Sequence, residues 1–281
     1  MGIKNISKIL KKYGKEVELK DFRDQKIAID TSNYLYKFKY KTKDNDFLKK
    51  FMNQIYIFKN YNITPVYVFD SQPLLEKQDT LEKRKVIKNC AKEENKIHVT
   101  EKDISNLKEL FDNLNVFYMD AVSEAEKTCS ILNKNKKVNC VFSNDFDSLV
   151  FGCENLVTYT SSTGYVKYNL KEILDDIEIT IENFIDVCIS CGCDYYDKGV
   201  SNVGPVKAIN NVKKYGKIEN WPKVVIPSEF NLENIRTIFT SEEELPDTLV
   251  SEKHSSIENL TNFLDKLHIT INPRTVKCVL P

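Results

Sequence analysis

The sequence predicts an α/β fold in which a mixed, mainly parallel sheet is flanked by helices. Short apolar runs rich in Val, Ile, Phe and Tyr alternate with segments in which apolar residues recur every three or four positions. That alternation is typical of strands linked by helices. Several of the apolar runs end on an acidic residue, as in KIAID and VYVFD. The carboxyl ends of parallel strands meet at one edge of a sheet, where such folds place their sites.

We expect the strands at 26–32, 66–70, 115–120, 138–143 and 156–161, and helices at 3–11, 46–60 and 257–267. Thr31 and Ser32 are good N-caps for a helix that follows the first strand. The strand at 66–70 is expected to start directly after Pro65. These spacings predict a sheet built largely of parallel strands.

The composition describes an ordinary globular protein. At 281 residues with 41% hydrophobic content, the chain can bury one large core plus a smaller appendage. The N-terminus has no signal-peptide pattern and no apolar run reaches the roughly 20 residues of a membrane span. Most of the eight cysteines sit in apolar runs, as reduced core cysteines do. We therefore expect a soluble, intracellular protein, in the nucleus or at a cytoplasmic replication site, with no membrane partner.

Charge is balanced overall but unevenly distributed. The formal net charge of zero argues against a generic basic nucleic-acid binder. Yet residues 34–61 carry seven Lys against two Asp, and residues 198–217 carry five Lys and no acid. A solvated face explains either run alone. Two such segments beside an acidic centre fit a polyanion that must be held in place.

The segment 72–114 changes character. Its residues 76–108 are rich in charge, helical in tendency and poor in apolar positions. Such a stretch packs poorly on a sheet, so we expect a protruding helical insertion. Beyond it, SEAE has the capping-box pattern, with Ser123 as N-cap and Glu126 three residues later. The pattern leaves open whether Glu126 caps a helix or binds a metal.

The last third begins with a hairpin between Gly199 and Gly204, followed by Pro205 where a helix would start. This pattern resembles a helix-hairpin-helix. We expect two parts, a core over 1–194 and a helical part over 195–281 packed on it.

Carboxylates crowd the predicted strand ends, and two unit charges 4 Å apart repel by about 4 kcal/mol at an effective dielectric of 20. Divalent cations would neutralise them, and oxygen ligands suit Mg²⁺ or Mn²⁺ better than Zn²⁺. Zinc bound by Cys188, Cys191 and Cys193 is disfavoured because there is no second Cys pair. The acids in question are Asp30, Asp70, Glu124, Glu126, Asp145, Asp147 and Asp194.

In their order along the chain, these motifs resemble the flap endonuclease family, the XPG/Rad2-type structure-specific 5′ nucleases. The resemblance rests on MGIKNISK, IAIDTS, ITPVYVFDSQP, MDAVSEAE, SNDFDSLVFG and CGCDYYDKGVSNVGPVKAI, which span residues 1 to about 215. It implies a PIN-like fold with a helical arch over about 72–114. It also implies hydrolysis of DNA phosphodiesters at 5′ flaps, branches or ends, in replication, repair or recombination.

The resemblance implies that all seven acids hold two Mg²⁺ ions, which Mn²⁺ can replace, with Asp145 and Asp147 at the centre of the chemistry. It assigns catalysis to Lys77 and Arg84, whose spacing puts both on one face of a helix. It assigns contacts with branched or flapped DNA to five residues and leaves a K⁺ ion at the hairpin as a further expectation. The five are Gly2, Tyr36, Gly199, Gly204 and Lys207.

The chain departs from cellular members of the family in three places. The segment between Asp30 and Asp70 is about a dozen residues shorter, and the arch is roughly twenty residues shorter. Its C-terminus INPRTVKCVLP shows no sliding-clamp motif. This compact form resembles those of large DNA viruses, and we expect a monomer.

Two other functions compete with this interpretation. A PIN-type ribonuclease shares the acid cluster at the strand ends, although the hairpin and the arch bases disfavour it. A non-catalytic branched-DNA binding factor would have lost metal ligands, and none of the seven is missing.

Overall fold

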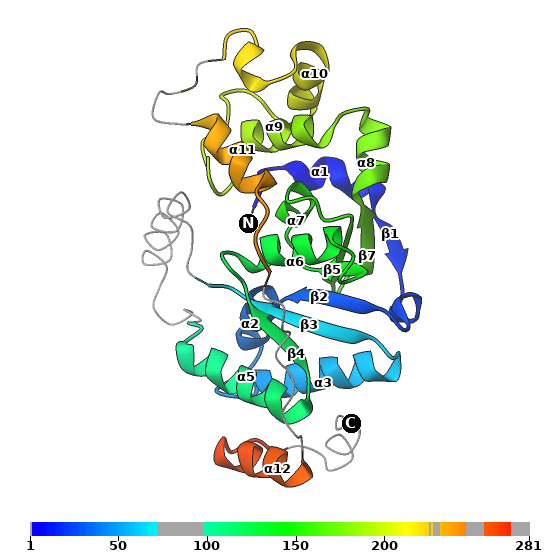
Figure 1. Ribbon diagram of the computed structural model, residues 1–281, viewed down its shortest axis with the longest axis vertical. Coiled ribbons are helices and arrows are strands. Elements are labelled where there is room, and N and C mark those ends of the chain that lie inside the picture. Colours follow the sequence, from blue (N-terminus) through cyan, green and yellow to red (C-terminus); the bar gives the residue numbers. More distant parts are fainter. Residues whose placement is uncertain (1, 72–97, 225, 227–230, 246–255, 271–281) are drawn as a thin grey trace.

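The computed structural model describes residues 2–71, 98–224, 226, 231–245 and 256–270. Its centre is a seven-stranded sheet in the order β1-β7-β6-β5-β2-β3-β4 (Figure 1). Strands β2 to β6 run parallel to one another, whereas β7 pairs antiparallel with both β6 and β1. The strands are β1 Lys15–Val17, β2 Lys26–Asp30, β3 Thr64–Phe69, β4 Phe117–Asp120, β5 Cys140–Phe142, β6 Asn155–Thr160 and β7 Gly164–Asn169.

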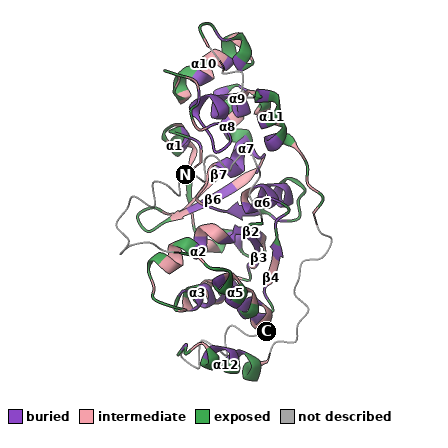
Figure 2. Cartoon of the chain, turned by 90° about the vertical axis from the view of Figure 1, so that its left-hand side faces the viewer, coloured by how far each residue is buried: buried purple, intermediate pink, exposed green. Residues whose placement is uncertain are grey.

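Helices cover both faces of the sheet (Figures 1 and 2). Helices α1, α6, α7, α8, α9, α10 and α11 share one apolar core with it, and α2, α3, α5 and α12 share the other. Their bounds are α1 Ile6–Leu10, α2 Thr31–Tyr40, α3 Phe47–Asn60, α5 Glu101–Leu114, α6 Ala125–Lys134, α7 Asp147–Val150, α8 Leu170–Ile177, α9 Ile181–Cys191, α10 Pro205–Tyr215, α11 Leu232–Thr240 and α12 Ile257–Lys266.

The side chains of strand β2 point alternately into the two apolar cores, so both faces of the sheet are buried at this strand. Ala28 packs into the core on the α6 side, whereas Ile27 and Ile29 pack into the core on the α3 side. Successive strand residues point to opposite faces, so a strand covered on both sides must be apolar at every position. The predicted fold class, a mainly parallel sheet flanked by helices, is therefore confirmed.

Strand β3 begins at Thr64, two residues earlier than expected, and Pro65 lies inside it rather than before it. At Pro65 the strand pairs only with β2, because pairing with β4 starts at Val66. A strand tolerates proline where it has a partner on one side only.

The predicted protruding insertion at 72–114 needs a correction at its end. Residues 72–97 lie outside the described residues. The part from Glu101 onward is α5, a core helix whose Leu107, Leu110, Phe111 and Leu114 are fully buried. Their i, i+3, i+4, i+7 spacing places them on one side of the helix as an apolar stripe. The low apolar content of the charged stretch as a whole conceals this stripe.

Two capping predictions are also wrong. Asp30, not Thr31 or Ser32, caps α2, since its carboxylate accepts a hydrogen bond from the Asn33 backbone N–H. Helix α6 begins at Ala125 with Glu124 at the N-cap, so the expected box between Ser123 and Glu126 does not form.

A helix-hairpin-helix follows the sheet, as expected from the sequence. Helix α9 ends at Cys191, and α10 begins at Pro205 with Gly204 as N-cap. Between them Gly199 has a φ of +62°, and a Cβ there would lie 2.7 Å from the Ser190 carbonyl oxygen. Only glycine fits this turn.

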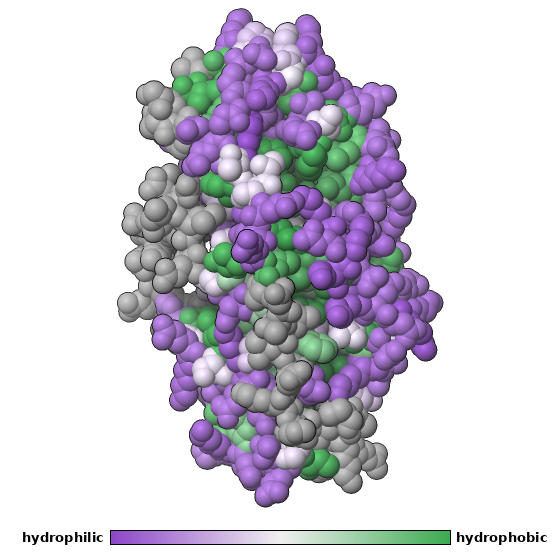
Figure 3. Space-filling model, viewed as in Figure 1, coloured by the Kyte–Doolittle hydropathy of each residue, from purple (hydrophilic) through white to green (hydrophobic). Residues whose placement is uncertain are grey.

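The outer surface is mostly polar. Hydrophilic residues cover most of the described surface on the face shown in Figure 3. No helix in the described part of the chain combines the length and the apolar composition that a membrane span requires.

Candidate active site

Three carboxylates converge beyond the carboxyl end of β5. Ligand oxygens of Glu126, Asp145 and Asp147 all lie within 4.8 Å of one another. Glu126 comes from the first turn of α6, and the two aspartates come from the β5–α7 connection and the start of α7. This is the grouping that the sequence predicts, and it is compact enough for one cation to be shared.

Asp30 joins this cluster through a serine. One carboxylate oxygen of Asp30 accepts the Asn33 N–H at 3.2 Å, and the other accepts the Ser143 hydroxyl at 3.0 Å. Ser143 in turn accepts the backbone N–H of Asp145 at 3.1 Å. The ends of β2 and β5 are thereby held in register.

Asp70 connects the end of β3 to α6. Its Oδ1 accepts the Ala125 backbone N–H at 2.8 Å, so it satisfies a donor in the first turn that no N-cap side chain reaches. In the same turn of α6, Glu126 lies beside Asp145 and Asp147.

Glu124 and Asp194 are buried beside the cluster. The Tyr195 hydroxyl donates a hydrogen bond of 2.9 Å to Glu124 Oε2. Asp194 follows α9, and its charge contributes to raising the pKa of Asp145 after the larger effect of burial. All seven predicted acids therefore lie at the same edge of the molecule.

The electrostatics show that these charges are crowded. Burial, and then the nearby charge of Asp70, raise the pKa of Asp30 to about 7. Burial likewise raises the pKa of Asp145. Among the residues that the structure describes, no lysine or arginine forms an ion pair with Asp30, Asp70 or Asp145. Buried, crowded carboxylates form the kind of environment that a hard cation neutralises.

The donor set fits a divalent cation that prefers oxygen. Six of the described cysteines are buried and free, and burial raises the pKa of both Cys191 and Cys193 to about 12. Among the described residues, the one group of three or more His, Cys, Asp or Glu side chains close enough to share an ion is Glu126, Asp145 and Asp147, and it contains no cysteine. An acidic cluster able to bind metal is thus present, whereas the alternative cysteine site is not supported.

Gly2 lies against the acids. A Cβ at this position would lie 2.3 Å from Asp145 Oδ1 and 2.5 Å from Asp147 Oδ1. The next residue, Ile3, donates its backbone N–H to Asp147 Oδ1 at 3.0 Å. The N-terminal segment thus forms one wall of the site.

Tyr36 is on α2, six residues beyond Asp30, and its side chain is 48% exposed. Its neighbours Tyr34 and Phe38 pack into the core, but Tyr36 does not. An aromatic residue at position 36 is therefore not there to pack the core.

The hairpin residues lie farther from the acids. Gly204 caps α10, and Lys207 in the first turn of that helix donates to the Asn202 carbonyl oxygen at 3.2 Å. Lys207 is exposed. The predicted catalytic bases Lys77 and Arg84 lie outside the described residues.

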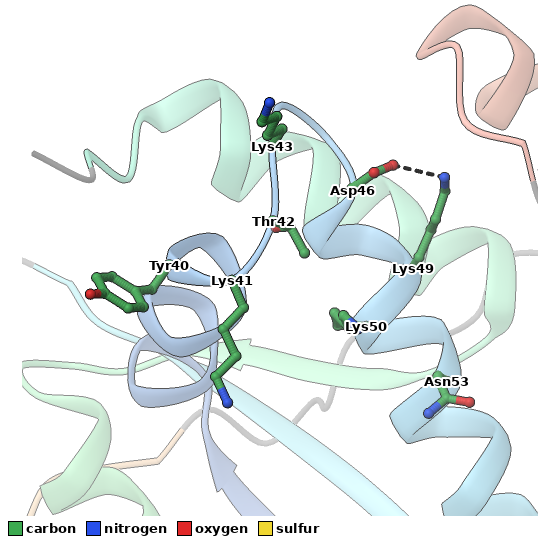
Figure 4. A pocket seen from close by; sticks show the side chains of 8 residues that line it. All are labelled: Tyr40, Lys41, Thr42, Lys43, Asp46, Lys49, Lys50 and Asn53. Carbon is green, nitrogen blue, oxygen red and sulfur yellow. Dashed lines mark ion pairs between the residues drawn. The ribbon is translucent and has the colours of Figure 1, made fainter. Parts of the chain in front are cut away.

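A lysine-lined pocket of about 630 Å³ opens between α2 and α3, within the basic segment 34–61 (Figure 4). Lys49 pairs with Asp46 at 2.8 Å. Lys41, Lys43 and Lys50 form no ion pair with any described residue. The pocket therefore carries excess positive charge.

Sequence reasoning missed the residues that hold the acids in place. Ser143 bridges two candidate ligands, and Tyr195 orients a third. Ser143 stands two residues before Asp145 and Tyr195 directly follows Asp194, so proximity to the acids was an available signal.

Models of two known protein regions match the chain. The XPG N-terminal domain matches residues 1–91, and the XPG I-region matches residues 115–194. Among curated proteins, the flap endonuclease 1 of Naegleria gruberi is 31% identical over 95% of this chain and 81% of its own length. That of Enterocytozoon bieneusi is 32% identical over 85% of this chain and 77% of its own length.

Solved structures share the fold. The catalytic core of Rad2 in complex with DNA substrate matches with a TM-score of 0.79 at 20% identity, over 95% of each chain. The flap endonuclease-1 of Methanococcus jannaschii matches with a TM-score of 0.76 at 24% identity, over 95% of this chain and 94% of its own.

Proposed function

Since the chain belongs to the flap endonuclease family of XPG-type, structure-specific nucleases, we propose that it cuts DNA phosphodiesters at 5′ flaps, branches or ends. The observation that carries the proposal is the convergence of Glu126, Asp145 and Asp147 within 4.8 Å beside Asp30 and Asp70. We infer that it acts in DNA replication, repair or recombination.

The acids would hold two Mg²⁺ ions, for which Mn²⁺ can substitute. When bound, such ions lower the pKa of a water nucleophile and stabilise the charge of the leaving 3′ oxygen. The protein's part is to hold the oxygens in place. Ser143 fixes Asp30 relative to Asp145, and the Asp70–Ala125 hydrogen bond fixes α6. Glu124 and Asp194 complete the set of seven.

Substrate binding would use the exposed groups around this edge. Exposed Tyr36 is suited to stack on a base beside the cut. Gly204 and Lys207 are exposed and would bind duplex phosphates through a backbone N–H group and a lysine charge. Gly199, which the sequence assigned to the same role, is buried and donates its N–H to the Tyr196 carbonyl oxygen at 3.4 Å, so its part would be to shape the hairpin. A K⁺ ion at the hairpin belongs to the same proposal.

Two further features support a DNA substrate. The lysine-lined pocket between α2 and α3 would offer excess positive charge to a phosphate backbone. In the insertion, Lys77 and Arg84 would neutralise charge on the scissile phosphate. Structural neighbours include Rad2 with DNA substrate and human GEN1 with Holliday junction DNA. A monomer is sufficient for all of these contacts.

A panel of labelled substrates tests the proposal. Purified protein with Mg²⁺ should cut a 5′-flap duplex, and Asp145→Ala should cut at least about 1,000-fold more slowly while binding the flap nearly as tightly. Preferential cutting of single-stranded RNA would instead identify a ribonuclease. Binding to branched DNA without any product, at every Mg²⁺ concentration, would identify a non-catalytic factor.

A further inference from the structure

The segment that follows α11 passes beside α6 (Figure 1). Its residue Glu243 is a carboxylate with an unusually complete set of partners. One oxygen accepts the Ser123 hydroxyl at 2.5 Å and pairs with Lys127 Nζ at 3.2 Å. The other oxygen accepts the Thr128 hydroxyl at 3.2 Å.

This contact is buried rather than superficial. The side chains of Glu243 and Lys127 are only 8% and 7% exposed, and Thr128 is fully buried. Lys127 also donates to Ser241 Oγ at 2.9 Å, which adds a second contact between the two segments. Burying an ion pair and two hydroxyls is expensive unless every group is satisfied, so the arrangement is geometrically specific.

The partners of Glu243 bracket the turn that carries two candidate metal ligands. Ser123 directly precedes Glu124, whereas Lys127 and Thr128 directly follow Glu126. The Ser123 carbonyl oxygen also accepts the Ser71 backbone N–H at 3.2 Å, beside Asp70. The Glu243 carboxylate therefore binds side chains at both ends of the turn, and the Ser71–Ser123 hydrogen bond ties the turn to the end of β3.

The segment is itself anchored to the hairpin end of the molecule. Arg236 on α11 donates to both carboxylate oxygens of Asp186 on α9, at 2.6 and 2.9 Å. Ser241 lies one residue past the end of that helix. Glu243 thus lies three residues beyond a helix that is itself tied to α9.

We propose that the segment Ser241–Glu243 is a latch for the metal centre and that Glu243 is its positioning residue, holding Glu124 and Glu126 where a cation can bind both. This inference rests on the proposed function, because it assigns those acids to a divalent cation. Glu243 is not one of the three residues whose ligand oxygens come together, so its effect on the site would be indirect. It acts through the hydroxyls of Ser123 and Thr128.

The test compares metal binding with stability in four variants. Glu243→Ala removes every contact and leaves Lys127 buried without its partner. Lys127→Met/Glu243→Ala removes both charges, so no unpaired charge is buried. It still lacks the hydrogen bonds from Ser123 and Thr128. Glu243→Gln keeps groups that can bond both hydroxyls, and Glu244→Ala changes an exposed neighbour.

Two readouts are needed: the Mg²⁺ concentration at half-maximal flap cleavage, and the rise in melting temperature that Mg²⁺ causes in DNA-free protein. We expect Glu243→Ala to raise the midpoint about 10–100-fold and to shrink the thermal shift, as loss of a ligand-orienting partner does. Lys127→Met/Glu243→Ala should regain melting temperature in EDTA but not Mg²⁺ affinity. Glu243→Gln should recover most of the affinity, and Glu244→Ala should match wild type.

The latch is refuted if the double variant regains both stability and Mg²⁺ affinity, since Glu243 would then matter only for folding. An unchanged Mg²⁺ response in Glu243→Ala refutes it as well. Failure of the nuclease function is separate: wild-type protein that gains stability with Mg²⁺ yet cuts no DNA refutes the activity, while the thermal shifts still decide on the latch.

Discussion

Gly2 approaches Asp145 so closely that a Cβ at position 2 would lie 2.3 Å from the carboxylate oxygen Oδ1. Its φ of +85° also disfavours any other residue. The carboxylate has little freedom to yield, because the Asp147 backbone N–H holds the same oxygen at 3.2 Å. The N-terminus is therefore shaped to fit the acids.

We predict that Gly2→Ala lowers the rate of flap cleavage by about 100-fold, because a displacement of the acids by about 1 Å is enough for such a loss. The melting temperature should change little, since position 2 contributes no core side chain. Lys8→Ala, exposed on α1, serves as the control. A Gly2→Ala protein of normal activity would show that the fit has no role in cleavage.

Tyr195→Phe should slow catalysis with little effect on DNA binding. The change removes only the hydroxyl that holds Glu124 Oε2, and such supporting hydrogen bonds are typically worth about 10-fold or more in activity. Single-turnover rates should fall while the Kd for flap DNA stays constant. Tyr215→Phe on α10 controls for loss of a hydroxyl, and equal effects of the two variants would argue against orientation of Glu124.

Removing charge from the lysine-lined pocket should weaken DNA binding and leave the chemical step intact. For Lys41→Gln/Lys50→Gln we expect a higher KM and a reduction of up to about 2 in the slope of log K against log salt, one for each lost phosphate contact. Lys136→Gln/Lys137→Gln, before β5, removes equal charge elsewhere. If both double variants show the same slope, the pocket does not contact the DNA backbone.

Arg236→Met should destabilise the hairpin end of the molecule. It leaves Asp186, whose side chain is 3% exposed, without its bidentate partner, and breaking a buried pair in this way costs about 3–5 kcal/mol. Denaturant unfolding measures the loss. A loss well below that range would mean that water reaches Asp186 once the arginine is gone.

The stabilisation by Arg236 should also depend on pH. Its hydrogen bond lowers the pKa of Glu219 below the usual 4.5. A carboxyl with a lowered folded-state pKa stabilises the fold above its unfolded pKa and stops doing so as the pH falls through the folded value. The stability difference between wild type and Arg236→Met should therefore narrow below pH 4.5. Unfolding curves from pH 7 to 3 test this, and a difference that widens with acid would contradict it.

The site was largely predictable because it depends on local pattern. Asp30, Asp145 and Asp147 each follow a short apolar run, and parallel strands bring such ends together whatever lies between them. Other features depend on contacts between distant residues. Ser123 has the pattern of an N-cap, but Glu243, 120 residues away, takes its hydroxyl. The residues next to Ser123 in the sequence do not indicate that its hydroxyl bonds to Glu243.

In the fold, too, elements with a strong local pattern were predicted and elements without one were missed. The apolar strands of the parallel part were predicted, but β1 and β7 were missed. Strand β1 has three residues and no buried one, so it carries no hydrophobic signal of its own. Helix α11 was hidden in an acidic stretch, although Ile235, Ile238 and Phe239 form a buried stripe.

The central claim is that crowded carboxylates are tolerated here because divalent cations neutralise them, and thermal unfolding of DNA-free protein tests it most directly. In EDTA, Asp145→Asn should melt above wild type, since Asn still accepts the Asp147 N–H but adds no charge. Mg²⁺ at about 100 times its Kd should stabilise wild type by about 2.7 kcal/mol. The variant should gain much less. Wild type that gains nothing from Mg²⁺, together with a variant that melts no higher in EDTA, would contradict the claim.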